Sequence, residues 1–99
     1  MIPPSFFNRR LARSESVVYR QIAGEALLVP IYTRVEDAGS IYSLNEVAAR
    51  FWDLADGARD VGQIRDILVD EFEVSAQVLE EDLAELIEKL LAVEVLKEV

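Results

Sequence analysis

The chain of 99 residues contains neither cysteine nor histidine, and both absences exclude kinds of site. Without cysteine it has no disulfide, no thiolate nucleophile and no zinc ribbon. Without histidine it lacks the commonest general base and the commonest metal ligand. Glycine is scarce as well, and none of the four glycines stands in a phosphate-binding loop pattern. We therefore expect no catalytic residues, no metal and no cofactor.

Long apolar runs are also missing from the sequence. No run approaches the roughly 20 residues that a membrane-spanning helix needs, and the first residues lack the apolar core and cleavage site of a secretory signal. The apolar fraction of 52% nevertheless fills a core, and 29% charged residues indicate a folded domain in solution. We expect a cytoplasmic protein without a membrane partner.

The acidic residues are placed unevenly along the chain. Up to Arg65, eight acids accompany eight bases, whereas from Asp66 onward eleven acids accompany only Lys89 and Lys97. The last third therefore carries the whole net charge of −9. A surface of this sign repels nucleic acid and attracts basic partners, although excess acid also simply keeps a small protein in solution.

Residues 1–14 are predicted to form an N-terminal arm ahead of a domain over residues 15–99. Two prolines favour extended chain, and three arginines make the segment basic. Phe6 and Phe7 are too apolar for a free tail, so we expect the arm to dock on the domain or on a partner. Because an arm can exchange between chains, a homodimer is possible.

Three β-rich runs follow the arm. Ser16–Ile22 and Ala26–Thr33 are rich in the β-branched and aromatic residues that favour strands, which predicts two strands joined by a turn at Gly24. Ser40–Leu44 is predicted to be a short third strand. After it the hydrophobic period changes from that of a strand to that of a helix.

Two short helices are predicted next. The first begins at Ser43 or Asn45, which are both good N-caps, and ends at Gly57, a residue type that commonly terminates helices. The second begins at Asp60, with Gln63 in the position of a capping box.

The third helix is predicted from Ser75 to about Ala92, ahead of a tail that forms either a short strand or a frayed helix end. Its apolar stripe consists of Leu79, Leu83, Leu86, Ile87, Leu90 and Leu91. Strands followed by helices predict an α+β domain. Its N-terminal three-stranded antiparallel sheet followed by three helices is the composition of a winged helix-turn-helix.

Acidic side chains on the predicted helices do not suggest acid–base catalysis, because acids on an outer helix face are all solvated alike. Asp82 differs, since it lies at the edge of the apolar stripe. A hydrogen-bonding role within the fold and a contact with a partner both remain open for it.

Nucleic acid is the usual partner of a winged helix-turn-helix, and a nucleic-acid-binding or regulatory protein is therefore the alternative function. Its recognition helix would carry lysine and arginine. The third helix instead carries five acids against Lys89, which argues against this alternative.

An exposed sheet edge can accept an extended peptide as an additional strand. If Ser40–Leu44 is an edge strand beside the third helix, a groove forms between them. The acidic helix wall would then select a peptide with basic residues and a few apolar anchors.

The stretch IYSLNEVAARFWDLADGARDVGQIRDIL resembles the core of coenzyme PQQ synthesis protein D. Its relatives are the RiPP recognition elements of systems that modify ribosomally made peptides. The resemblance covers roughly residues 25–93. The matching positions are Tyr42, Leu44, Asn45, Ala48, Ala49, Phe51, Trp52, Leu54, Asp56, Gly57, Ile64, Leu68, Asp82 and Leu83.

The resemblance implies a winged helix-turn-helix that performs no chemistry. Members of the family bind the leader of a precursor peptide as an added strand and present it to a modifying enzyme, such as a radical SAM protein or a lasso-type protease. It leaves open which pathway is served, whether PQQ, lasso or another. Carried onto this chain, it predicts that the peptide-binding residues are Ser40, Ile41, Tyr42, Ser43 and Leu44 on the strand and Val78, Leu79, Asp82, Leu83 and Leu86 on the helix. Trp52 and Asn45 would be structural, and Glu94 departs from the family pattern, which has glycine there.

Overall fold

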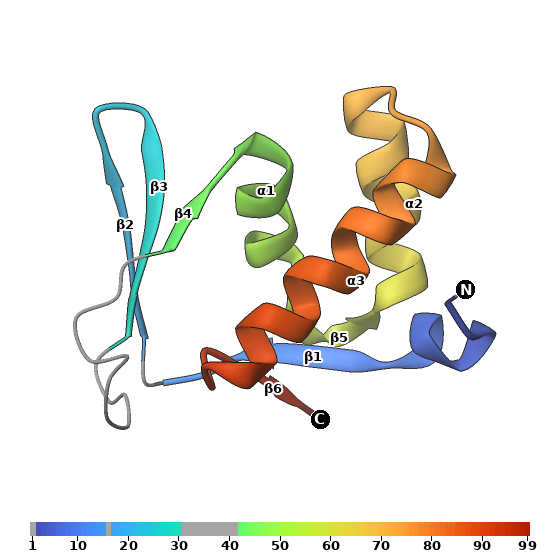
Figure 1. Cartoon of the computed structure of the whole chain (residues 1–99), viewed down its shortest axis with the longest axis horizontal. Helices are drawn as coiled ribbons and strands as arrows, with labels where there is room; N and C mark the ends of the chain where they lie inside the picture. Colours follow the sequence, from blue (N-terminus) through green and yellow to red (C-terminus); the bar gives the residue numbers. More distant parts are fainter. Residues whose placement is uncertain (1, 16, 31–41) are drawn as a thin grey trace.

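The change of hydrophobic period near residue 45 separates a strand-rich part from a helical part. The computed structural model describes residues 2–15, 17–30 and 42–99, and it has an α+β fold with three helices (Figure 1). The strands are β1 Arg10–Arg13, β2 Val17–Ile22, β3 Glu25–Pro30, β4 Tyr42–Leu44, β5 Asp56–Asp60 and β6 Leu96–Glu98. The helices are α1 Glu46–Leu54, α2 Val61–Phe72 and α3 Ala76–Ala92, preceded by a 3-10 turn, η1 Pro4–Asn8.

The three predicted strands form one antiparallel sheet in the order β2–β3–β4. Leu28 pairs with Tyr42 and Ala26 with Leu44. Because alternate residues of a strand face the same side, Ala26, Leu28 and Leu44 are buried together on one face. The predicted strand positions Ser16, Ser40, Ile41 and 31–33 lie outside the described residues.

A second antiparallel sheet, in the order β5–β1–β6, was not predicted, although β6 confirms the short strand that was one of the two alternatives for the tail. Its middle strand β1 comes from the expected N-terminal arm and runs beneath the helices (Figure 1). Leu11 of β1 is buried, with 1% of its surface exposed. Arg13 donates to the carbonyl oxygens of Trp52 (2.6 Å) and Asp53 (3.0 Å) at the end of α1. The arm thus docks on the body, while a domain boundary at residue 15 stays a prediction.

A bidentate ion pair joins the two ends of the chain. Arg9 donates to both carboxylate oxygens of Glu98, at 2.9 and 2.6 Å, and these hydrogen bonds lower the pKa of the Glu98 carboxyl. Because that pKa is lower in the folded than in the unfolded state, the pair stabilises the fold above the unfolded-state pKa. The contribution disappears as pH falls through the folded-state pKa. It is small, since both side chains are partly exposed.

The helix starts follow the sequence closely. Asn45 is the N-cap of α1, and Asp60 with Gln63 forms the predicted capping box of α2. Ser75 precedes α3 as expected but makes no side-chain capping bond. The predicted end of α1 at Gly57 is wrong, because α1 ends at Leu54 and Gly57 lies within β5. There its φ of 84° favours glycine, and an added Cβ would lie 3.3 Å from Val99.

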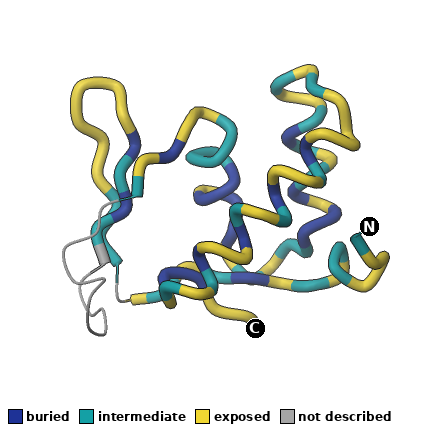
Figure 2. Tube along the Cα trace, in the orientation of Figure 1, coloured by how far each residue is buried: buried dark blue, intermediate teal, exposed yellow. Residues whose placement is uncertain are grey.

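The core lies where the helices meet β1 and the buried face of the first sheet. Figure 2 shows buried residues on the inward sides of all three helices and in the middle of β1. Trp52, 3% exposed, is a core residue as expected. The predicted α3 stripe is confirmed: Leu79, Leu83, Ile87 and Leu90 are buried, and Leu86 and Leu91 are partly buried against them.

Leu11→Ala should lower the free energy of unfolding by about 2–5 kcal/mol, because it leaves a cavity under the helices. Urea unfolding followed by circular dichroism measures the change. Ile22→Ala is the control, since Ile22 is a strand residue that is 54% exposed, and it should cost less than about 1 kcal/mol. Equal losses for the two variants would show that β1 is not part of the core.

Candidate functional site

The candidate site begins where β4 passes directly into α1. Asn45, the residue between them, has extended backbone angles (φ −73°, ψ 178°), so it continues the line of the strand. Its side-chain oxygen accepts a hydrogen bond of 2.8 Å from the backbone N–H of Ala48. The side chain of Asn45 therefore caps the start of α1, and no loop separates α1 from β4.

One edge of β4 carries no partner strand among the described residues. The other edge of β4 pairs with β3, so β4 is the last strand in the described part of this sheet. In an antiparallel strand, successive residues direct their N–H and C=O groups alternately toward the partner and away from it. The backbone between Tyr42 and Leu44 therefore presents hydrogen-bonding groups at its outer edge, which can take up a further strand.

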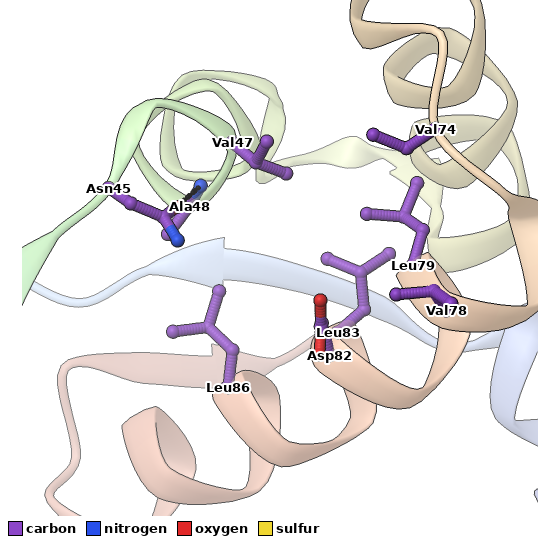
Figure 3. A pocket seen from close by; sticks show the side chains of 9 residues that line it. All are labelled: Asn45, Val47, Ala48, Val74, Val78, Leu79, Asp82, Leu83 and Leu86. Atoms are coloured by element: carbon purple, nitrogen blue, oxygen red, sulfur yellow. Dashed lines mark hydrogen bonds between the residues drawn. The ribbon is translucent and has the colours of Figure 1, made fainter.

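A groove of about 290 Å³ lies between the first turn of α1 and the side of α3. In Figure 3 side chains of both helices point into the space between them. Leu79 and Leu83 are buried and line the groove from the core side, whereas Val78 is 54% exposed at its rim. The full lining consists of Asn45, Val47, Ala48, Val74, Val78, Leu79, Asp82, Leu83 and Leu86.

All five residues predicted on the third helix lie together in this lining. The predicted strand residues Tyr42, Ser43 and Leu44 form β4, which leads into the groove at Asn45 but does not line it. Ser40 and Ile41 lie outside the described residues. A peptide contact for any of these ten residues stays a prediction.

Four lining residues were not assigned to the site from the sequence: Asn45, Val47, Ala48 and Val74. The α1 residues could have been found, because a strand that runs into a helix places the first helical turn beside the strand end. Val74 gave no such signal, since its position depends on how the connection between α2 and α3 folds.

Asp82 is the charged residue of the lining. It is exposed, and it makes no hydrogen bond or ion pair with another residue in the described ranges. A hydrogen-bonding role within the fold is therefore not observed there. The acids Glu71 and Glu80, by contrast, are paired with Arg50 and Arg65.

Other kinds of site are not found in residues 2–15, 17–30 and 42–99. These ranges contain no group of three or more metal-ligating side chains that could hold an ion. None of the helices within them is long and apolar enough to cross a membrane.

Two comparisons relate the chain to known proteins. The family model of coenzyme PQQ synthesis protein D matches residues 25–96, a range that contains β4 and the whole groove lining. The chain is also similar to a solved structure described as TbiB1 in complex with the TbiA(beta) leader peptide. The two are 26% identical with a TM-score of 0.69, over 87% of this chain and 94% of that one. A search of curated proteins found no match.

Asn45→Ala should lower the free energy of unfolding by about 1 kcal/mol, because the N–H of Ala48 loses its acceptor. Asn45→Ser, whose hydroxyl also caps helices, should stay within a few tenths of a kcal/mol of the wild type. Denaturant unfolding of the three proteins measures both values. If serine were as costly as alanine, the capping bond would not be what Asn45 contributes.

Proposed function

The chain belongs to the family of coenzyme PQQ synthesis protein D, and from this premise we propose that it is a non-catalytic peptide-binding protein. Its ligand is the leader of a ribosomally made precursor peptide, which it presents to a modifying enzyme. The observation that carries the proposal is the apolar groove beside β4, together with the edge of β4 that has no partner strand among the residues the structure describes. The similar TbiB1 structure, which contains a leader peptide, supports the same class of ligand.

The leader binds as an extended strand along the open edge of β4. Its backbone exchanges hydrogen bonds with the outward-facing groups of Tyr42–Leu44. Ser40 and Ile41, which were predicted from the sequence as peptide contacts, are part of the same proposal. Since alternate side chains of a strand point to opposite sides, every second leader side chain faces the groove. The backbone bonds supply affinity for any extended peptide, and the groove supplies selectivity.

Chemistry is left to the partner enzyme. A chain without histidine and cysteine has few means of activating a nucleophile, but a bound and extended leader holds the following peptide segment at a fixed place for another active site. A radical SAM protein and a lasso-type protease are both suitable partners. The proposal includes a winged helix-turn-helix as the fold of the protein and the cytoplasm as its location.

Binding of nucleic acid by the same fold is disfavoured by charge. α3 exposes Glu81, Asp82, Glu85 and Glu88, whereas a recognition helix needs cations to neutralise phosphates. Arg65, the cation of α2, is already paired with Asp66 and Glu80.

Val78→Arg should weaken binding of the leader about tenfold. The change replaces an exposed apolar rim residue, so it removes contact area and blocks the groove without disturbing the core. The neighbouring genes are first searched for a short precursor peptide. Its synthetic leader is the ligand, and fluorescence anisotropy measures the dissociation constant.

Gln77→Arg is the matched control, because it adds the same charge to the neighbouring exposed position of α3 outside the groove lining. Circular dichroism verifies that both variants fold. Equal affinity of the two variants would place the peptide elsewhere and contradict the proposed groove.

A further inference from the structure

We propose that the groove selects leader segments in which an apolar side chain is accompanied by a lysine or arginine, with the basic side chain lying over Asp82 and Glu85. This inference rests on the proposed function, since it specifies which peptides the same groove accepts.

The apolar requirement follows from the lining. Seven of its nine residues are apolar, the exceptions being Asn45 and Asp82, and the amide of Asn45 is already engaged with Ala48. A volume of about 290 Å³ lies at the lower limit of ligand pockets. The groove therefore holds one or two apolar side chains of an extended peptide.

The basic requirement follows from the rim. Asp82 and Glu85 are three residues apart on α3, which places them side by side on one ridge. A second, shallower hollow is lined by Asp82, Glu85, Leu86 and Lys89, and it shares Asp82 and Leu86 with the groove. A peptide that leaves the groove at this end therefore passes over both carboxylates.

Neither carboxylate is paired with a cation in the described part of the chain. Asp82 and Glu85 are exposed and form no ion pair with any residue of the described ranges, and Lys89, four residues beyond Glu85, is not within ion-pair distance of it. On the opposite wall, the first turn of α1 adds Glu46 and no basic residue. The charges around the groove therefore favour a cation and repel a carboxylate.

The expected selectivity is modest for each contact. An exposed ion pair changes affinity about 1.5- to 5-fold, so two carboxylates around one basic side chain should give a preference of about three- to tenfold. This is enough to rank leaders of similar apolar content, and salt should weaken it.

Selection from a random library of 12-residue peptides tests the inference and does not require the sequence of the natural leader. The peptides are displayed in many copies on each phage, so that weak binders are retained through avidity. Three immobilised proteins are compared: the wild type, the Asp82→Asn/Glu85→Gln variant, and the Glu81→Gln/Glu88→Gln variant. The last is the matched control, since it loses the same charge from exposed α3 positions outside the groove lining.

We expect the wild type and the control to enrich peptides with an apolar residue and a nearby lysine or arginine. The Asp82→Asn/Glu85→Gln variant should keep the apolar preference and lose the basic one. It should also bind a selected wild-type peptide about three- to tenfold more weakly than the control does.

Two results would overturn the inference alone: apolar peptides without a basic preference, or a basic preference that Asp82→Asn/Glu85→Gln leaves intact. The second would assign the preference to the net charge of the protein. A different result would overturn the proposed function and the inference with it, namely that no peptides are enriched, or that enriched peptides bind Val78→Arg as well as the wild type.

Discussion

The direct passage from β4 into α1 through Asn45 is the constraint on which the groove depends. Because no loop separates the strand from the helix, the strand edge and the first helical turn keep a fixed relation. The end of β4 thus lies beside Val47 and Ala48, across from α3 (Figure 3). A longer connection would leave the same edge in place but would remove one wall of the groove.

Adjoining side chains on one surface of α3 pack into the core and line the groove. Leu79 and Leu83 are buried in the core and also line the groove, and Val78, Asp82 and Leu86 continue that surface toward solvent. The stripe is therefore wider than the core alone requires. β1 supports this arrangement from below, since it places Leu11 in the core and joins the last described strand, β6, to the body.

Local signals in the sequence predicted the parts of the fold that local interactions determine. The capping box of Asp60 and Gln63 and the stripe of α3 both arise from residues three or four positions apart. The second sheet arises from pairings such as Leu11 with Glu98, which are distant in sequence. The tail that contains β6 suggested a strand as one alternative, but nothing local indicated its partners β1 and β5. Gly57 was misread for the same reason, because its neighbour Val99 is 42 positions away.

The candidate site shows the same division. The α3 wall was predictable because its residues share one helix face, and the family resemblance indicated which part of that face to consider. Val74 could be assigned only once the connection between α2 and α3 was known. The charge pattern was visible as an acidic last third, but its meaning depends on pairing. Glu80 is joined to Arg65, whereas Asp82 beside the groove has no partner in the part of the chain that the structure describes.

Amide hydrogen exchange along β4, with and without the synthetic leader, tests the central claim most directly. An added strand must bond to outward-facing backbone groups, so exchange should slow at least about tenfold at one or more of Tyr42, Ser43 and Leu44 when the leader saturates the protein. Slower exchange confined to β2 or to η1, with β4 unchanged, would contradict binding of the leader at this edge.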